Sequence, residues 1–197
     1  MSALPGLVLA SGSPRRRELL SQLGLSFAVV APDIDETPRA GERAVELVRR
    51  LAVEKAAAVA GDPVLAADTT VEVDGEILGK PIDRDDARRM LRRLSGRSHK
   101  VHTGVAVRAG ERLATDVATT IVTFVALTPP VLEWYVDTGE PFDKAGAYAI
   151  QGTGGVLVEG IRGSVSNVVG LPLTSVAKLL HQVTGWTVTS ERLGPPA

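Results

Sequence analysis

Residues 9–20, LASGSPRRRELL, take the chain from an apolar run into a predicted helix. Ser13 suits the N-cap position, because its hydroxyl can accept a hydrogen bond from a free N–H of the first turn, and Pro14 suits the first helical position, where its missing N–H would have no partner. Arginines 15–17 then fall in the first turn, where the helix dipole already places partial positive charge. We expect a negative group, either a phosphate or neighbouring carboxylates, to offset that cost.

Working outward, short apolar runs alternate with amphipathic segments along the whole chain. The dipeptide Asp74-Gly75 predicts a tight hairpin turn. The expected strands cover residues 6–10, 27–31, 63–68, 70–73, 76–78, 101–107, 118–125, 147–151 and 156–161, and the expected helices residues 14–23, 42–60, 83–94, 128–139 and 171–184. This order predicts an α/β fold with a mixed sheet flanked by helices.

Composition limits the class of protein. The 197 residues are 44% apolar, enough for one domain, 1–197, or for two small lobes, with 186–197 as a flexible tail. We expect a cytoplasmic protein, because cysteine is absent and MSALPGLVLA lacks the basic start and long apolar stretch of a signal peptide. No run approaches the roughly 20 apolar residues of a membrane span. A net charge of −1 argues against a broad nucleic-acid or membrane surface.

Lys55 interrupts the apolar stripe of the helix expected over 42–60. The stripe runs through Val45, Val48 and Ala52 to Val59, and Lys55 occupies the position between the last two. An unpaired lysine is costly to bury. The side chain therefore either extends to solvent at the edge of the stripe or points into a site with a negative partner, and the helix pattern leaves both open.

Charged residues gather where strands end, helices begin or the chain turns. Basic groups beside helix N-termini suit a polyphosphate, and carboxylates suit Mg²⁺ or Mn²⁺. A metal-bound water beside a carboxylate base can attack phosphorus, although the same pattern also fits unrelated surface charges. The cations are Arg15, Arg16, Lys55, Lys80 and Lys144, and the acids are Asp33, Asp35, Glu36, Asp68 and Asp143.

Two further positions favour nucleotide chemistry. Asp68 follows the apolar run 64–67, so its carboxylate is expected at the carboxyl end of a strand, although an acid there also simply begins a turn. Gln151 precedes a glycine-rich loop, and its amide offers both a donor and an acceptor, as a nucleobase edge requires; the more frequent role is a bond to main chain. The arginines at 88, 89, 92 and 93 are interpreted as a solvated helix face.

Familiar catalytic signatures are missing from the sequence. It contains no Gly-x4-Gly-Lys-Ser/Thr loop, no His-Glu-x-x-His and no Gly-x-Ser-x-Gly. The histidines at 99, 102 and 181 lack the spacing of metal ligands, which makes a histidine-based mechanism a poor explanation.

Eight segments occur in register along the chain: LASGSPRRRELL, DIDET, RLAVEKA, LAADTTV, GKP, LSGRSHKVHTGVAV, DKAGAYAIQG and GSVSNVVGLP. Together they resemble the Maf family of nucleoside triphosphate pyrophosphatases, from Leu7 to about Leu180. The resemblance implies cleavage between the α- and β-phosphates, giving a monophosphate and pyrophosphate and clearing non-standard or surplus nucleotides. It also implies an elongated, inosine-triphosphatase-like fold with a central cleft, a divalent cation such as Mg²⁺ or Mn²⁺, and a homodimer.

The resemblance assigns roles to particular residues. Asp68 matches the catalytic acid, and Glu36, with Asp68, would hold the metal. Lys55 and Lys80 match other positions that the activity requires. The phosphate-handling loop and the base-selecting positions would be Ser11, Arg15, Arg16, Thr69 and Gln151.

Arg15, Thr69 and Gln151 together resemble the branch of the family that acts on UTP and dTTP, with CTP or modified pyrimidine nucleotides as further substrates. The alternatives are a 7-methyl-GTP or purine triphosphate pyrophosphatase, a nucleotide-binding regulator of cell division, and a nucleic-acid-binding protein. The net charge weighs against the last of these.

Overall fold

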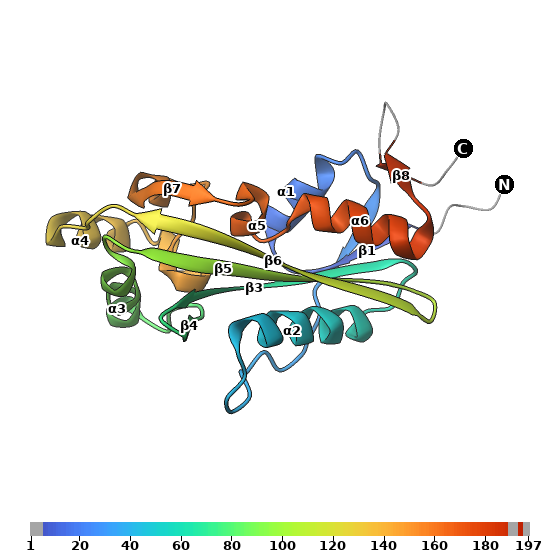
Figure 1. Ribbon diagram of the computed structural model, residues 1–197, viewed down its shortest axis with the longest axis horizontal. Coiled ribbons are helices and arrows are strands. Elements are labelled where there is room, and N and C mark those ends of the chain that lie inside the picture. Colours follow the sequence, from blue (N-terminus) through green and yellow to red (C-terminus); the bar gives the residue numbers. More distant parts are fainter. Residues whose placement is uncertain (1–5, 189–192, 195–197) are drawn as a thin grey trace. The chain divides into compact units, whose positions relative to one another are not determined.

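A mixed β-sheet forms the centre of the fold in the computed structural model, which describes residues 6–188 and 193–194. The strand order is β2-β1-β3-β5-β6-β7, and β4 pairs with β3 (Figure 1). β1 runs parallel to both β2 and β3, whereas the β3–β4 and β6–β7 pairs are antiparallel. The strands are β1 (Leu7–Ala10), β2 (Phe27–Val30), β3 (Val64–Val73), β4 (Glu76–Leu78), β5 (Ser98–Ala109), β6 (Arg112–Phe124) and β7 (Val158–Arg162).

Within the described residues, six α-helices and three short 3₁₀ helices lie between or after these strands. The α-helices are α1 (Pro14–Ser21), α2 (Ala44–Ala58), α3 (Arg84–Leu94), α4 (Pro129–Asp137), α5 (Val165–Val169) and α6 (Leu173–Thr184), and the 3₁₀ helices are η1 (Glu140–Asp143), η2 (Ala145–Ala147) and η3 (Thr153–Leu157). The expected α/β class with a mixed sheet is therefore confirmed. Every α-helix within the described residues is too short or too polar to traverse a bilayer.

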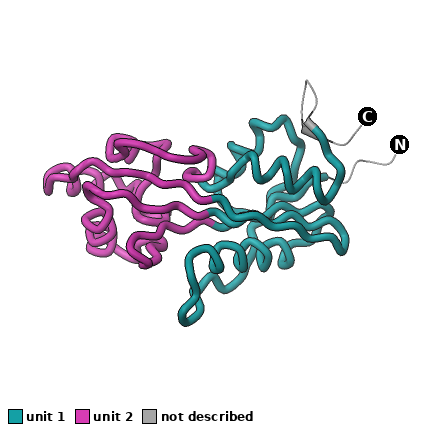
Figure 2. Tube along the Cα trace, in the orientation of Figure 1, with its two compact units in different colours: residues 1–68, 103–118, 170–197 teal, residues 69–102, 119–169 magenta. Residues whose placement is uncertain are grey.

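The chain divides into two compact units (Figure 2). Unit 1 contains residues 1–68, 103–118 and 170–197, and unit 2 contains residues 69–102 and 119–169. The divisions at Asp68/Thr69, His102/Thr103 and Ala118/Thr119 fall within β3, β5 and β6, so these three strands contribute to both units. The cleft that the resemblance implies stays a prediction.

In unit 1, α2 covers one face of the sheet, and α1 and α6 cover the other (Figure 1). The apolar side of α2, including Ala52 and Ala56, packs on small side chains of β1, β3 and β5. Gly104 of β5 permits this close packing, because a Cβ there would overlap the main-chain carbonyl of Val48 in α2. The helix that carries Lys55 is therefore held tightly against the sheet.

In unit 2, α3 and α4 pack on β3, β5 and β6 around a core that includes Leu91, Phe124 and Tyr135. His99 is buried at the edge of this core, and its ring meets Phe124 and Tyr148 edge to face, with centroids 5.0 and 5.4 Å away. His99 is thus an ordinary strand residue of β5. The α3 arginines lie mostly exposed, and four of them form ion pairs: Arg84 with Asp137, Arg88 with Glu133, Arg89 with Glu76 and Arg93 with Asp74.

Two local expectations have clear outcomes. The turn at Asp74-Gly75 is confirmed, with both residues in the left-handed region at φ +51° and +80°. The strand expected over 147–151 is wrong. Gly146 and Ala147 take left-handed conformations, at φ +70° and +61°, and the chain runs through turns at 150–151.

The tail expected over 186–197 lies mostly outside the described residues, as do residues 1–5. Its described parts, β8 (Thr187–Val188) and β9 (Leu193–Gly194), pair as a short antiparallel sheet.

Candidate active site

Lys55 joins two carboxylates in the interior of unit 1. Its Nζ lies 2.6 Å from Oδ1 of Asp68 and 2.8 Å from Oε1 of Glu36. Lys55 and Asp68 are only 5% and 7% exposed, whereas the side chain of Glu36 is half exposed. The lysine thus occupies a core-facing position of α2 because it has negative partners there. Of the two orientations that the helix pattern left open, the side chain takes the one that points to negative groups.

The sheet topology explains the position of Asp68. β1 pairs with β3 only as far as Ala66, and Asp68 lies two residues beyond that last pair, at the carboxyl end of β1. Side chains at this edge of parallel strands are not covered by a neighbouring strand, which is why α/β folds commonly build sites there. Glu36 reaches the same place from the loop between β2 and α2.

Arg16 of α1 binds main-chain carbonyls beside Asp68. Its Nε donates to the carbonyl of Gly170 at 2.8 Å, and its Nη1 donates to the carbonyl of Ala67 at 2.7 Å. Nη1 also approaches Oγ of Ser11 at 3.3 Å. The guanidinium therefore connects the start of α1 to Ala67, the residue before Asp68, and to Gly170, which precedes α6.

The electrostatic surroundings of Arg16 indicate that its guanidinium lies near the carboxylates of Asp68 and Glu36. Burial lowers the pKa of Arg16, while the charges of Asp68 and Glu36 oppose this and that of Arg15 adds to it. Ser13 takes the N-cap position of α1, as expected, and its N–H donates to Oγ of Ser11 at 3.2 Å. Neighbouring carboxylates are thus one of the two negative groups that the sequence predicted for this helix start.

Unit 2 carries the remaining predicted residues. Thr69 follows Asp68 within β3, Lys80 is exposed in the link between β4 and α3, and Gln151 is exposed in the turn before η3. Unit 1 therefore brings together Ser11, Arg15, Arg16, Glu36, Lys55 and Asp68, and unit 2 holds Thr69, Lys80 and Gln151.

Three of the other charged loop residues have structural partners. Asp35 accepts a hydrogen bond from the N–H of Thr37 at 2.9 Å, which shapes the acidic loop. Lys144 forms an ion pair with Asp143 and donates to the carbonyl of Glu140 at 3.2 Å. These contacts support loops, and Asp33 is exposed.

The donor set suits a divalent cation held jointly with a phosphate ligand. Within residues 6–188 and 193–194, no three His, Cys, Asp or Glu side chains cluster as a complete metal site. Mg²⁺ is commonly bound by one or two carboxylates together with substrate phosphates. Glu36 and Asp68, brought together on Lys55, supply two carboxylates of this kind.

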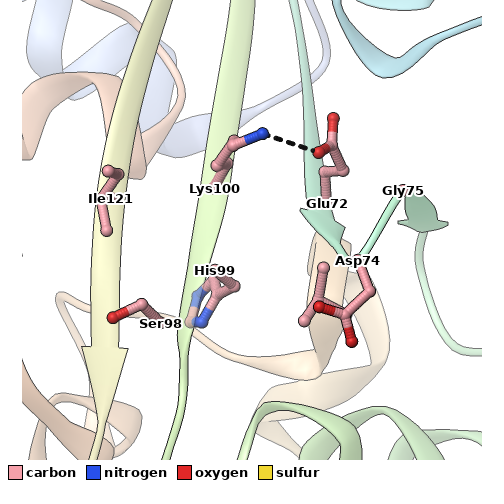
Figure 3. A pocket seen from close by; sticks show the side chains of 8 residues that line it. Glu72, Asp74, Gly75, Ser98, His99, Lys100 and Ile121 are labelled. Carbon is pink, nitrogen blue, oxygen red and sulfur yellow. Dashed lines mark hydrogen bonds and ion pairs between the residues drawn. The ribbon is translucent and has the colours of Figure 1, made fainter.

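A cavity of about 320 Å³ in unit 2 is lined by none of the predicted site residues (Figure 3). Its charged side chains neutralise one another or their neighbours: Glu72 pairs with Lys100 at 3.0 Å, and Asp74 pairs with Arg97 at 2.6 Å. This cavity therefore lacks the free charges that a polyphosphate site needs.

The carbonyls of Ala67 and Gly170 could not be predicted as partners of Arg16 from the sequence. Main-chain acceptors leave no residue signature, and Gly170 is 154 positions away from Arg16. Glu140 was likewise not predicted as a site residue, although its carboxylate accepts hydrogen bonds from the loop after Gln151.

Known proteins are similar to this chain over most of its length. The family model described as Maf-like protein matches residues 6–183. A dTTP/UTP pyrophosphatase of Myxococcus xanthus is 60% identical over 180 residues, covering 89% of this chain and 91% of its own. One of Anaeromyxobacter dehalogenans is 58% identical, covering 95% and 98%. One of Chromobacterium violaceum is 55% identical, covering 89% and 93%. The solved Ham1 protein of Staphylococcus aureus aligns at a TM-score of 0.43 and 16% identity over 60% of this chain and 71% of that one, too low to support an argument.

Proposed function

Because the chain belongs to the Maf family, we propose that it is a nucleoside triphosphate pyrophosphatase that hydrolyses dTTP and UTP to the monophosphate and pyrophosphate. The relatives that cover about nine-tenths of the chain carry that activity in their names. The observation that carries the proposal is the buried Lys55 between Asp68 and Glu36.

Asp68 acts as the general base in this proposal. It takes a proton from a water molecule whose oxygen bonds to the α-phosphorus, while the bond from the α-phosphorus to the bridging oxygen breaks and pyrophosphate leaves. Lys55 binds Oδ1 of Asp68, which fixes the carboxylate and leaves Oδ2 for the proton. A positioned base of this kind contributes about 10²–10⁴-fold to the rate.

Glu36 and Asp68 are the residues that would hold Mg²⁺ or Mn²⁺. The cation would neutralise charge that develops on the phosphate oxygens. Ser11, Arg15, Arg16 and Lys80 would bind the phosphates, since guanidinium and ammonium groups are suited to phosphate oxygens. The bonds from Arg16 to Ala67 and Gly170 give it a second task, which is to hold the main chain beside Asp68.

Thr69 and Gln151 would select the base. Uracil and thymine present an imide N–H donor beside carbonyl acceptors, and the Gln151 amide presents the complementary acceptor and donor. We further propose that the enzyme acts in the cytoplasm and that it forms a homodimer. Size-exclusion chromatography with light scattering will test the oligomeric state.

A nucleotide panel tests the proposed function. The substrates are dTTP, UTP, CTP, dATP, GTP and 7-methyl-GTP, each with Mg²⁺ and with Mn²⁺, and pyrophosphate and orthophosphate are measured separately. We expect dTTP and UTP to be hydrolysed fastest, with one pyrophosphate released per monophosphate. In H₂¹⁸O the label should enter the monophosphate, because attack occurs at the α-phosphorus.

Three results would contradict this proposal. Preference for 7-methyl-GTP would identify the chain as a 7-methyl-GTP pyrophosphatase. Release of orthophosphate would identify a different bond as the one cleaved. Binding of UTP without turnover under either metal would favour a nucleotide-binding regulator.

A further inference from the structure

The Glu140 side-chain carboxylate accepts three hydrogen bonds in unit 2. Its Oε1 accepts from the hydroxyl of Tyr135 and from the N–H of Gly154, each at 2.8 Å. Its Oε2 accepts from the N–H of Thr153, also at 2.8 Å. The carboxylate therefore holds the first turn of η3, which begins two residues after Gln151.

Tyr135 extends the same network to the other side of Gln151. Its ring is completely buried in the core, and its hydroxyl accepts a hydrogen bond from the N–H of Ala149 at 3.1 Å while donating to Glu140. The chain is thus fastened at Ala149 and again at Thr153 and Gly154, on both sides of the exposed Gln151.

Glycines allow the loop to approach this network closely. A Cβ at Gly154 would lie 2.5 Å from the Tyr135 hydroxyl oxygen, and a Cβ at Gly152 would overlap the Glu140 carboxylate. The glycine-rich run 152–155, which the sequence analysis noted without a role, has residues without side chains where the loop meets the Tyr135–Glu140 pair.

The Glu140 carboxylate is charged at neutral pH. Partial burial alone would raise its pKa, but hydrogen bonds from Gly154, Tyr135 and Thr153 outweigh burial and leave the pKa below its usual value. Hydrogen bonds to an ionised acceptor are about twice as strong as those between neutral groups. A charged group in this position fixes the loop more firmly than a neutral one.

We propose that the Tyr135–Glu140 pair is a positioning device for substrate specificity, which holds the 149–154 loop so that the Gln151 amide is presented to the base in one orientation. This inference rests on the proposed function, in which Gln151 reads the base. Neither Tyr135 nor Glu140 is a catalytic residue in this account, because both act through the loop.

Two variants test the pair. Glu140→Gln keeps the shape of the side chain, but its amide nitrogen then faces an N–H donor of the loop. Tyr135→Phe removes only the hydroxyl and keeps the buried ring. Glu133→Gln in α4 is the matched control, since it neutralises a carboxylate that binds Arg88 on the surface of the same unit.

The kinetic readout separates positioning from a general loss of structure. For Glu140→Gln we expect the KM for dTTP and UTP to rise by about 10-fold, the size expected when a hydrogen bond to a charged group is lost. The kcat should stay near the wild-type value, and the preference for dTTP over CTP should fall. In a Gln151→Ala background, Glu140→Gln should cause no further loss of preference, because the residue that the loop presents is already gone.

Amide hydrogen exchange without nucleotide tests the network independently of activity. Residues 149–154 should exchange faster in Glu140→Gln and in Tyr135→Phe than in wild type and Glu133→Gln. If Glu140→Gln does not fold, Tyr135→Phe carries both measurements.

Unchanged exchange in the loop would overturn the positioning role, and so would faster exchange with an intact preference for dTTP. An equal fall in kcat for every substrate, or additive effects of Glu140→Gln and Gln151→Ala, would show a purely structural role. Failure of the wild-type enzyme to hydrolyse dTTP or UTP would refute the proposed function and the specificity role together, and the exchange data would still decide whether the pair holds the loop.

Discussion

Replacing Lys55 with methionine should destabilise the protein strongly even without substrate. Methionine retains an apolar stem for the core-facing position, so the main loss is the ammonium group. Lys55 and Asp68 are 5% and 7% exposed and their charged atoms lie 2.6 Å apart. Removing one partner leaves the Asp68 carboxylate buried without the cation that contacts it, which costs about 3–5 kcal/mol.

A double-mutant cycle isolates the contribution of the contact. Adding Asp68→Asn to Lys55→Met removes the buried charge that has lost its contacting cation, so the double variant should be less destabilised than the two single losses predict. A charge-assisted hydrogen bond contributes about 1.5–3 kcal/mol, and we expect a coupling free energy of about 2 kcal/mol between the two positions.

Urea unfolding of the four proteins, followed by circular dichroism at pH 7.5, measures this coupling. With a slope of roughly 2 kcal/mol per M, Lys55→Met should lower the unfolding midpoint by about 1.5–2.5 M. Lys178→Met, at an exposed position of α6, should change the free energy of unfolding by less than about 0.5 kcal/mol. Additive effects of Lys55→Met and Asp68→Asn would refute the view that this contact holds Asp68.

Three further outcomes follow from particular side chains. Burial lowers the pKa of His99 to about 4 from 6.5, so the unfolded chain takes up a proton that the native protein does not. Stability should be fully present above pH 6.5 and fall by about 3 kcal/mol towards pH 4, and a His99→Gln variant with the same acid dependence would contradict this assignment. Gly104→Ala should lower the free energy of unfolding by about 1–3 kcal/mol, because the new Cβ overlaps the main chain of α2, whereas Gly160→Ala in β7 meets no atom within 4 Å; equal midpoints in urea for these two variants would be inconsistent with the packing. Arg16→Lys keeps the charge but loses the fork that binds two carbonyls, so kcat/KM for dTTP should fall by about 10-fold or more, whereas wild-type kinetics would show that the charge alone suffices.

Several features of the site could be predicted because their cause is local. The LASGSPRRRELL turn contains its own helix signals, and Lys55 is conspicuous because a charge interrupts a regular apolar stripe. Asp68 follows an unbroken apolar run, which predicts the end of a buried strand. Each of these features is visible within one short segment of the sequence. Predicting it therefore requires no knowledge of residues far away in the chain.

Other features depend on contacts that no local pattern contains. The 147–151 segment is apolar enough to resemble a strand, yet left-handed conformations at Gly146 and Ala147 and a hydrogen bond from the N–H of Ala149 to Tyr135 give it a different path. Arg16 is an evident candidate for phosphate, but its bonds to the carbonyls of Ala67 and Gly170 depend on the fold of unit 1. The sequence around Glu140 resembles that of any acidic residue in a loop. Only the structure shows that its carboxylate binds the N–H groups of Thr153 and Gly154.

The central claim is that the Asp68 carboxylate takes the proton from the water that attacks the α-phosphorus. Pyrophosphate release from saturating dTTP with Mg²⁺, compared between wild type and a folded Asp68→Asn variant, measures this most directly. Asp137→Asn, a surface carboxylate paired with Arg84, is the control. The account predicts a loss of about 10²–10⁴-fold for Asp68→Asn and none for the control. An Asp68→Asn enzyme that turns over at the wild-type rate would contradict it.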